Sequence, residues 1–466
     1  MNTMATHHSS ETGRSTTPTP PFRVAVVGLG KIGLPLSVQF AGSGCTVIGA
    51  DTNPAVVEIV LGGAAPFPGE DELDERLGAA LAAKRFTATT DTTDAVSRSN
   101  VVVIVVPLIV DHDTKEPDFR ALDAATAAVA SGLQPGTLVC YETTLPVGTT
   151  RDRLAPGLAT VSGLTLGTDL FVCFSPERVS SGRIFRDLAR YPKLVGGLDP
   201  TSTSLGIAFY EAALEFDDRP DLSRPNGVWD LGSAEAAELA KLAETTYRDI
   251  NIAFANELAR HCDSRGIDVG RVIEASNSQP FSHIHQPGVA VGGHCIPVYP
   301  HLYLRGDPSA EMPQASRRVN DRMPTYCVAQ LAALRGDLRG LRVAVLGLAY
   351  RGGVKETAFS GCWALVEELR RLGAVPVVQD PLYSADELRA FGLSPFNLGE
   401  PIDAVIVQSD HVEYRTLSPA SVPGAGALID GRNIVADLDA FTAAGVAWRV
   451  LGRRSNVDEL AEREAR

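Results

Sequence analysis

The chain has 466 residues, a length that fits two or three domains. Its content of 44% hydrophobic and 21% charged residues is typical of a globular protein. The net charge of −14 argues against nucleic acids and anionic membranes as partners, because both would repel the chain. We therefore expect no nucleic-acid partner and no membrane partner. A small anionic ligand remains possible, because it needs only a local basic pocket or a helix N-terminus.

Two segments and the spacing of the cysteines predict where the protein is located. The most apolar run, residues 101–110, contains Pro107 and is far shorter than the ~20 residues of a membrane-spanning helix. Residues 1–21 are rich in Ser, Thr, Pro and His and are predicted to be a disordered tail, not a secretion signal. The seven cysteines form no close-spaced pairs, which predicts reduced thiols, no paired-cysteine metal site and a cytoplasmic location.

From Phe22 onward, short apolar segments alternate with helical segments, a pattern typical of a parallel sheet covered on both faces. Strands are expected over residues 24–27, 47–50, 101–106, 137–143 and 170–174, with a covering helix over residues 122–130. Residues 233–265 contain no proline or glycine and predict a helix of roughly 50 Å. Ser233 suits the start of this helix and Gly266 its end.

The strand pattern returns after Leu341. Strands are expected over residues 343–346, 375–378, 404–407 and 428–429, with an amphipathic helix over residues 361–372. We therefore predict an α/β protein in which two Rossmann-like parallel-sheet domains are joined by a long central helix or helical domain. The predicted boundaries are residues 22–230 for the first sheet domain, 231–325 for the central domain and 326–466 for the second sheet domain.

A dinucleotide fingerprint, VVGLGKIG, lies between the first strand and the first helix. Its three glycines allow a tight turn, a close approach of the backbone to a pyrophosphate and close packing of helix on strand. The expected cofactor contacts in this turn are Gly28, Leu29, Gly30, Lys31, Ile32 and Gly33. Asp51 ends the next strand, where its carboxylate can accept both ribose hydroxyls. Thr52 and Asn53 provide no arginine for a 2′-phosphate, so NAD is favoured over NADP.

A single cysteine, Cys295, lies in the loop VGGHCIPVYPH over residues 291–301. The glycines let another molecule approach and the prolines stiffen the loop, a setting in which a thiol can act as a nucleophile. The alternative is an inert core cysteine. Four histidines surround it and suggest zinc, but only the spacing of His283 and His285 resembles a ligand pair. We therefore expect no metal.

On the long predicted helix, Lys241, Thr245 and Arg248 share one face because they are four and three residues apart. A lysine near a reacting carbonyl can stabilise a developing oxyanion. The alternative is a solvated charged stripe.

Several motifs together resemble one family. They are VVGLGKIGLP, TTLPVGTT (143–150), SPERV (175–179), AELAKLAETTYRDINIAFANELA (237–259), PGVAVGGHCIPVYP (287–300), VLGLAYR (345–351) and LIDGRN (428–433). In order and spacing they resemble the nucleotide-sugar 6-dehydrogenases, the UDP-glucose/GDP-mannose dehydrogenase family, over almost all of residues 22–440. The variants PERV, YRDINIAFANELA and GGHCIPV are most similar to the branch that oxidises UDP-N-acetylhexosamines to mannosaminuronate or glucosaminuronate products.

The resemblance implies a four-electron oxidation of a sugar C6 alcohol to a carboxylate, with two hydride transfers to NAD, in polysaccharide biosynthesis. Cys295 would add to the aldehyde, and the thiohemiacetal would be oxidised to a thioester and hydrolysed. The implied catalytic residues are Cys295, Lys241, Glu177, Thr144 and Thr245, and Val106 and Thr144 would also contact NAD. The first sheet domain would bind NAD, the second would bind the UDP portion, and the long helix would form a homodimer.

The resemblance also implies a set of contacts to a UDP-sugar substrate. They are Glu177, Arg178, Lys241, Arg248, Ile284, His285, Gln286, Pro287, Gly288, Gly292 and Arg351.

The chain departs from the family pattern at several positions. Thr245 replaces a common Asn, Tyr299 a common Asp, Val106 a common Thr and Arg351 a common Lys, while Glu356 and Ala358 replace a common Asp and Arg. These departures keep three alternatives open: a UDP-glucose 6-dehydrogenase, a two-electron β-hydroxyacid-type dehydrogenase, and a nucleotide-binding protein without turnover. The number of NADH molecules formed per UDP-sugar separates the last two from a four-electron oxidation.

Overall fold

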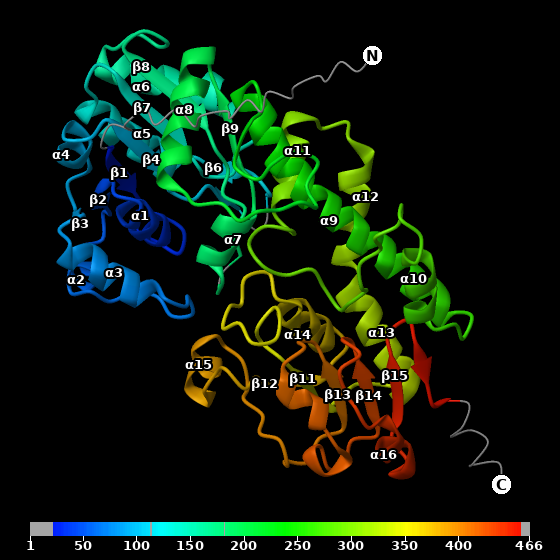
Figure 1. The fold of residues 1–466 in the computed structure, drawn as a ribbon. Helices are drawn as coiled ribbons and strands as arrows, with labels where there is room; N and C mark the ends of the chain where they lie inside the picture. Colours follow the sequence, from blue (N-terminus) through cyan, green and yellow to red (C-terminus); the bar gives the residue numbers. More distant parts are fainter. Residues whose placement is uncertain (1–21, 112–113, 181, 458–466) are drawn as a thin grey trace, which may run out of the picture. The chain divides into compact units, whose positions relative to one another are not determined.

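The computed structural model describes residues 22–111, 114–180 and 182–457, and the described residues form two compact units. Figure 1 labels most of their helices and strands. The first unit contains residues 22–106, 123–143 and 154–234, and the second contains residues 107–122, 144–153 and those from 235 onward. The predicted disordered tail, residues 1–21, lies outside the described ranges.

The first unit is built on an eight-stranded sheet in the order β10-β9-β8-β7-β4-β1-β2-β3. Its strands are β1 (Arg23–Val27), β2 (Thr46–Ala50), β3 (Phe86–Thr89), β4 (Val101–Ile104), β7 (Thr137–Tyr141), β8 (Leu170–Phe174), β9 (Lys193–Gly197) and β10 (Val228–Asp230). Neighbouring strands are parallel except β8 and β9, which are antiparallel. The sequence predicted five of these strands, and two of them end two residues earlier than expected, at Ile104 and Tyr141.

Helices pack against this sheet because their apolar faces have no other surface to bury. They are α1 (Gly33–Gly42), α2 (Pro54–Leu61), α3 (Leu73–Ala82), α4 (Thr92–Ser97), α5 (Arg120–Gly132), α6 (Ala155–Ser162), α7 (Ile184–Arg190) and α8 (Pro200–Ala213). A π-helical turn at Thr150–Leu154 precedes α6, and its residues 150–153 belong to the second unit. Phe40 of α1 and Phe209 of α8 meet edge to face, with ring centres 5.3 Å apart, and both are fully buried. Their burial joins helices distant in sequence into one core.

The long predicted helix is present as α9 (Ala234–Asp263), with 30 residues. It ends two residues before the predicted end, just ahead of Gly266, which has φ +65°, and the amide of Ile267 bonds back to the carbonyl of Cys262 at 3.0 Å. This left-handed conformation favours glycine, which explains why the helix stops there. The helices that follow are α10 (Val269–Asn277), α11 (Tyr299–Gly306), α12 (Glu311–Asp321) and α13 (Met323–Arg335). A small hairpin, β5 (Ile109–Val110) and β6 (Pro117–Asp118), belongs to the same unit.

A six-stranded sheet completes the second unit, in the order β12-β11-β13-β14-β15-β16. Its strands are β11 (Arg342–Leu346), β12 (Val375–Gln379), β13 (Ala404–Val407), β14 (Ala427–Asp430), β15 (Ala447–Val450) and β16 (Arg454–Ser455), and its helices are α14 (Gly361–Arg371), α15 (Ala385–Ala390) and α16 (Leu438–Ala443), with 3₁₀ turns at Val412–Thr416 and Pro419–Ser421. All neighbours are parallel except the terminal pair β15 and β16. The predicted fold class, two Rossmann-like sheets with a helical region between them in sequence, is confirmed.

Candidate active site

The fingerprint turn of the first unit has the shape expected of a pyrophosphate cradle. Gly28 has φ +97°, and a side chain at Gly33 would run into the carbonyl oxygen of Gly28. A Cβ at Gly30, by contrast, would meet nothing within 4 Å. One glycine is thus required by conformation, one by close packing, and one borders open space where a phosphate can approach the backbone. These features fit a dinucleotide at the start of α1.

Asp51 is fastened to this turn. One carboxylate oxygen accepts the amide of Leu29 at 2.9 Å, and the other accepts the amide of Asn53 at 2.9 Å. The side chain is half-buried, and each oxygen has a further lone pair for a ribose hydroxyl. Near the end of β4, the hydroxyl of Thr143 donates to the carbonyl of Val106 at 2.5 Å, which fixes the backbone at the predicted cofactor contact Val106.

The same unit contains a charged cluster that the sequence reading did not predict in full. Lys193 Nζ lies 2.7 Å from Glu142 Oε2 and 3.0 Å from Glu177 Oε2. Glu177 was predicted from the SPERV motif, whereas Lys193 and Glu142 were not. A lysine that opens a parallel strand would lie at the opposite edge of the sheet, and only the antiparallel direction of β9 brings it beside the end of β8.

In the second unit, Cys295 is the exposed thiol. Of the seven cysteines, all unpaired, six are buried and Cys295 alone is partly exposed. It lies in the turn before α11, where its carbonyl accepts the amides of Val298 at 3.2 Å and Tyr299 at 2.9 Å. A nucleophile needs this exposure, so the structure disfavours the alternative of an inert core cysteine.

The loop of Cys295 is held against residues 350–358. The amide of Gly293 donates to the carbonyl of Ala358 at 2.8 Å, and a Cβ at Gly292 would lie 2.5 Å from Tyr350 Cβ. His294 Nε2 lies 3.2 Å from Glu356 Oε2, so the exposed His294 contacts a residue of the same segment. Gly292 is therefore needed for close packing, while its predicted contact with substrate stays a prediction.

Three predicted residues of the second unit gather around Tyr299. Lys241, only 6% exposed on α9, places its amine 5.9 Å from the centre of the Tyr299 ring. Burial raises the pKa of the Tyr299 phenol, and the nearby thiol of Cys295 raises it further, while a hydrogen-bonding interaction with Thr144 opposes the shift. The structure thus brings Cys295, Lys241 and Thr144 to one phenol, which stays protonated at neutral pH.

Thr245 does not direct its hydroxyl toward this group. Its Oγ1 bonds to the carbonyls of Lys241 at 3.0 Å and Leu242 at 3.1 Å, within its own helix. A threonine on a helix commonly bonds back to the preceding turn, whereas an asparagine amide would reach farther. In this conformation the hydroxyl of Thr245 therefore has no donor available for the predicted catalytic role.

The predicted substrate loop, residues 284–288, is held by three asparagines that the sequence reading missed. Asn251 donates to the carbonyl of His283 and accepts the amide of His285, both at 2.8 Å. Asn256 accepts the amide of Gly288 at 3.0 Å, and Asn277 pairs with the amide and carbonyl of Ile284 at 2.8 and 2.9 Å. Side-chain amides can substitute for backbone pairing in this way, so the loop has a fixed shape without being a strand.

One unpartnered polar atom and two arginines lie in or beside this loop. His285 Nε2 is buried without a hydrogen-bond partner among the described residues, and burial, together with the nearby Arg248, lowers the pKa of His285. Arg453 donates to Gln286 Oε1 at 3.0 Å. Arg432 Nη1 would lie 2.8 Å from a Cβ at Gly288, so that glycine makes room for the guanidinium. Neither arginine was predicted. Both lie beside a loop expected to contact a diphosphate, and each also has an aspartate partner, Asp410 at 3.4 Å for Arg432 and Asp268 at 3.5 Å for Arg453.

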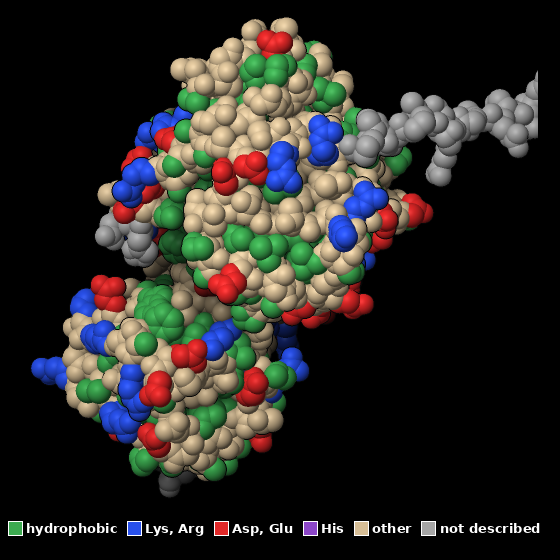
Figure 2. Space-filling model, turned by 90° about the vertical axis from the view of Figure 1, so that its left-hand side faces the viewer, with side chains coloured by type: hydrophobic (Ala, Val, Ile, Leu, Met, Phe, Trp, Pro, Cys, Tyr) green, Lys and Arg blue, Asp and Glu red, His purple; other side chains and the backbone are tan. Residues whose placement is uncertain are grey.

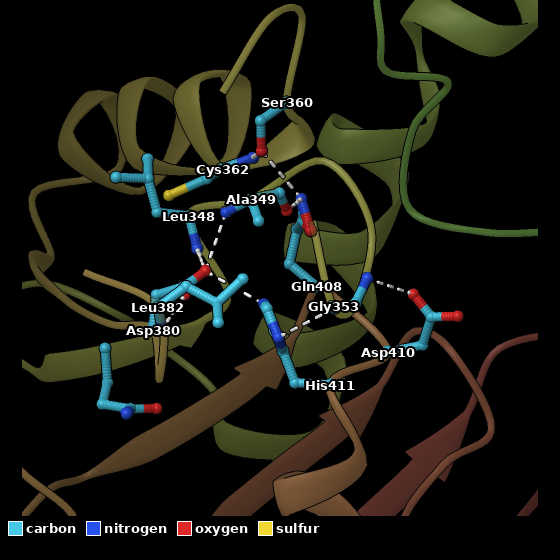
Figure 3. A network of polar contacts seen from close by, with 12 residues as sticks. Leu348, Ala349, Gly353, Ser360, Cys362, Asp380, Leu382, Gln408, Asp410 and His411 are labelled. Atoms are coloured by element: carbon cyan, nitrogen blue, oxygen red, sulfur yellow. Dashed lines mark hydrogen bonds and ion pairs between the residues drawn. The ribbon is translucent and has the colours of Figure 1, made fainter. Parts of the chain in front are cut away.

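The second sheet ends in a polar network that excludes a second dinucleotide site of the first kind (Figure 3). Asp380 is 3% exposed, and its Oδ2 accepts the amides of Leu348 at 2.7 Å and Ala349 at 2.8 Å. His411 Nε2 lies 3.1 Å from the same oxygen. Asp380 occupies the position that Asp51 has in the first sheet, but its carboxylate is enclosed by protein and not open to a ribose. The exposed Arg351 follows this turn.

On the face drawn in Figure 2, acidic and basic side chains of the described residues are interspersed, without an extended basic patch. No helix in the described ranges is long and apolar enough to cross a bilayer. The described residues contain no group of three or more His, Cys, Asp and Glu side chains that could hold a metal ion.

Comparison with known proteins adds a family. Three family models match in sequence: the NAD binding domain of the UDP-glucose/GDP-mannose dehydrogenase family over residues 22–214, its central domain over 235–322 and its UDP binding domain over 344–437. A UDP-N-acetyl-D-mannosamine dehydrogenase from Pyrococcus horikoshii is 34% identical over 439 residues, covering 92% of this chain and 99% of the relative. An NDP-N-acetyl-D-galactosaminuronic acid dehydrogenase from Ralstonia nicotianae is 31% identical, with coverages of 84% and 92%.

Solved structures agree with these matches. The UDP-D-ManNAc dehydrogenase structure from Pyrococcus horikoshii superposes with a TM-score of 0.81 at 32% identity, covering 92% of this chain and 99% of the other. A UDP-glucose dehydrogenase from Pyrobaculum islandicum gives a TM-score of 0.79 at 27% identity, with coverages of 91% and 97%.

Proposed function

Because the chain belongs to the UDP-glucose/GDP-mannose dehydrogenase family and is an NAD-dependent nucleotide-sugar dehydrogenase, we propose that it oxidises the C6 alcohol of a UDP-N-acetylhexosamine to the uronic acid. The reaction removes four electrons in two steps, with NAD accepting a hydride in each. The observation that carries the proposal is the partly exposed thiol of Cys295 among six buried cysteines. A thiol so placed can retain the aldehyde between the two oxidations.

In the first step the C6 alcohol loses a hydride and a proton and becomes an aldehyde. The Cys295 thiolate then adds to the carbonyl carbon, and the carbonyl electron pair becomes an oxyanion. Loss of the second hydride gives a thioester, and attack of water on the thioester breaks the carbon–sulfur bond, releases the carboxylate and two protons, and regenerates the thiolate. Two NAD are reduced for each sugar oxidised.

Three side chains would assist at distinct atoms. Lys241, whose amine lies beside Tyr299, would stabilise the oxyanion on the C6 oxygen. Glu177 would take the proton of the attacking water. Thr144, near the Tyr299 phenol, would help hold the proton at the alcohol oxygen. In the described conformation the hydroxyl of Thr245 bonds to its own helix, so we assign it a supporting role in the shape of α9.

Substrate binding is proposed for the loop of residues 284–288 with Gly292, Arg178, Arg248 and Arg351. The support is the loop's fixed backbone and the positive charge of Arg432 and Arg453 beside it. An N-acetylhexosamine is favoured because curated relatives at 34% and 31% identity act on N-acetylated sugar nucleotides by name. UDP-glucose is the second candidate, since a solved structure with a TM-score of 0.79 is a UDP-glucose dehydrogenase.

We further propose a homodimer through α9. Leu239, Tyr247 and Phe254 lie eight and seven residues apart, so they share one helix face, and they are 42%, 53% and 50% exposed. Three large apolar side chains in a row on one helix are typical of an interface. A cytoplasmic location stays a prediction from the seven unpaired cysteines.

The decisive experiment is NADH formation with a panel of UDP-sugars: the N-acetylated mannose, glucose and galactose forms and UDP-glucose. We expect two NADH per sugar consumed, with an N-acetylated sugar preferred. One NADH per sugar would indicate a two-electron dehydrogenase, and binding without NADH would indicate a protein without turnover. Cys295→Ala should abolish acid formation, and Cys295→Ser should stall at the aldehyde; wild-type acid production by Cys295→Ala would exclude the thiol.

A further inference from the structure

Glu177 is one end of a buried chain of polar groups in the first unit. The hydroxyl of Tyr210 on α8 donates to Glu142 Oε1 at 2.6 Å. Glu142 Oε2 and Glu177 Oε2 then share the amine of Lys193, at 2.7 and 3.0 Å. The side chains of Glu142, Lys193 and Glu177 are 0%, 4% and 10% exposed. This series of polar groups therefore runs from a closed inner end at Tyr210 to a more accessible outer end at Glu177.

The outer carboxylate is fixed through both oxygens. While Oε2 faces Lys193, Oε1 accepts the amide of Arg178 at 2.6 Å and that of Val179 at 3.2 Å. A carboxylate held in this way keeps one orientation and one set of lone pairs for a further partner. The inner carboxylate has a different environment, because burial raises the pKa of Glu142 while Lys193 opposes the shift.

We propose that Lys193 and Glu142 are positioning residues for the dehydrogenase reaction. Lys193 orients the Glu177 carboxylate and stabilises its negative charge. Glu142 binds the same ammonium group and so weakens the interaction of Lys193 with Glu177. This inference rests on the proposed function, in which Glu177 accepts the proton of the attacking water. A buried structural ion pair needs one carboxylate. The second carboxylate, nearer the surface and directed by two backbone amides, is what a positioning role explains.

Loss of Lys193 and loss of Glu142 should affect the charge of Glu177 in opposite directions, because the groups that face Glu177 differ in sign. From β9 comes the ammonium of Lys193, and from β7 the carboxylate of Glu142, whose other oxygen meets the phenol of Tyr210. Arg178, next to Glu177 in sequence, donates from its guanidinium to the carbonyl of Pro192 at 3.3 Å. Removing the ammonium leaves two carboxylates facing one another, and one of them must take up a proton. Removing the carboxylate of Glu142 leaves Glu177 as the only carboxylate that contacts the ammonium of Lys193 in this cluster.

The variants Lys193→Met and Glu142→Gln test this directly. In Lys193→Met, the pH below which turnover falls should rise by about one unit, which is about tenfold in rate at a fixed pH on that limb. In Glu142→Gln, the same limb should move to lower pH and the rate on the plateau should fall, because the ammonium of Lys193 then acts on Glu177 alone. Lys193→Arg keeps the charge and should restore the wild-type limb. The affinity for NADH should be unchanged in all three.

Matched controls are Lys84→Met and Glu211→Gln, because Lys84 and Glu211 are exposed in the same unit and Glu211 follows Tyr210 on α8. Both should leave the pH profile in place. A merely structural role for the cluster predicts lower stability with an unmoved limb, or movement in the same direction for both variants. Either result overturns the inference.

A readout without turnover separates this inference from the proposed function. In Lys193→Met, a carboxyl group would be protonated in the folded state at a pH where it is ionised in the unfolded chain. The variant should therefore lose stability relative to wild type as pH rises from about 5 to about 8, measured by urea unfolding. A pH-independent difference would overturn the inference. Absence of NADH formation by the wild type with every UDP-sugar would instead overturn the proposed function, and the unfolding result would still show whether Lys193 keeps a carboxyl group ionised in the folded protein.

Discussion

We predict that the stability of residues 144–153, the segment that contains Thr144, depends on pH through the side chain of Glu238. This fully buried side chain on α9 accepts the amides of Gly148 at 2.6 Å and Thr150 at 2.9 Å, and the hydroxyl of Thr150 at 2.6 Å. Burial raises the pKa of Glu238 from 4.5 to about 7, against these three hydrogen bonds. The folded state therefore prefers the protonated form.

The sign and size follow from this shift. A carboxyl group whose pKa is raised on folding contributes stability that is complete below its unfolded value and is lost as pH rises through the folded value. For Glu238 the window runs from pH 4.5 to about 7. A shift of this size corresponds to about 3 kcal/mol, or roughly a hundredfold in the equilibrium for local opening. Glu238→Gln removes the titration and one oxygen acceptor.

Amide hydrogen exchange of residues 144–153, corrected for the intrinsic pH dependence of exchange, measures this opening. Wild type should lose about a hundredfold in protection across the window, while Glu238→Gln should start less protected and change little. Glu235→Gln is the matched control, because Glu235 lies on the same helix and pairs with Arg151 of the same segment at a more exposed position. It should shift protection by less than about 1 kcal/mol at every pH. Parallel pH profiles for wild type and Glu238→Gln would refute the reasoning.

Three other changes test the site and the interface. Lys241→Met should lower kcat by about a hundredfold or more with unchanged NAD affinity, because only the oxyanion loses its cation; equal loss of both would make Lys241 a packing residue. Asn256→Ala should raise KM for the UDP-sugar by roughly tenfold, since the Gly288 amide loses its acceptor, and an unchanged KM would separate this loop from substrate. Tyr247→Glu combined with Phe254→Glu should yield a monomer in sedimentation velocity at micromolar concentration, whereas a persistent dimer would place the interface elsewhere.

The fold was predictable because it depends on local patterns. Apolar runs bounded by turn residues located most of the strands, and the absence of proline and glycine located α9 almost to the residue. The fingerprint glycines and Asp51 follow from conformational limits that any such turn must meet. The strand β9 (Lys193–Gly197) was not predicted, and a short strand does not in any case reveal its direction. That direction alone brings Lys193 to Glu177.

The site divides in the same way. Cys295 and Lys241 could be found from motif and spacing, since each carries its own chemical signal. The asparagines that hold the substrate loop carry none: Asn251 and Asn256 look like ordinary polar positions of a helix until the loop is seen against them. Asp380 shows that the same position in two similar sheets does not imply the same function. It matches Asp51 in position, yet His411 and two backbone amides enclose its carboxylate.

The mass of the peptide that contains Cys295, after acid quenching during turnover with UDP-N-acetylmannosamine and NAD, tests the covalent route most directly. An increase by the mass of the nucleotide-sugar acyl group on that cysteine, absent without NAD, is the expected result. Two NADH formed per sugar by an enzyme whose Cys295 peptide never gains mass, even when Glu177→Gln slows the final hydrolysis, would contradict it.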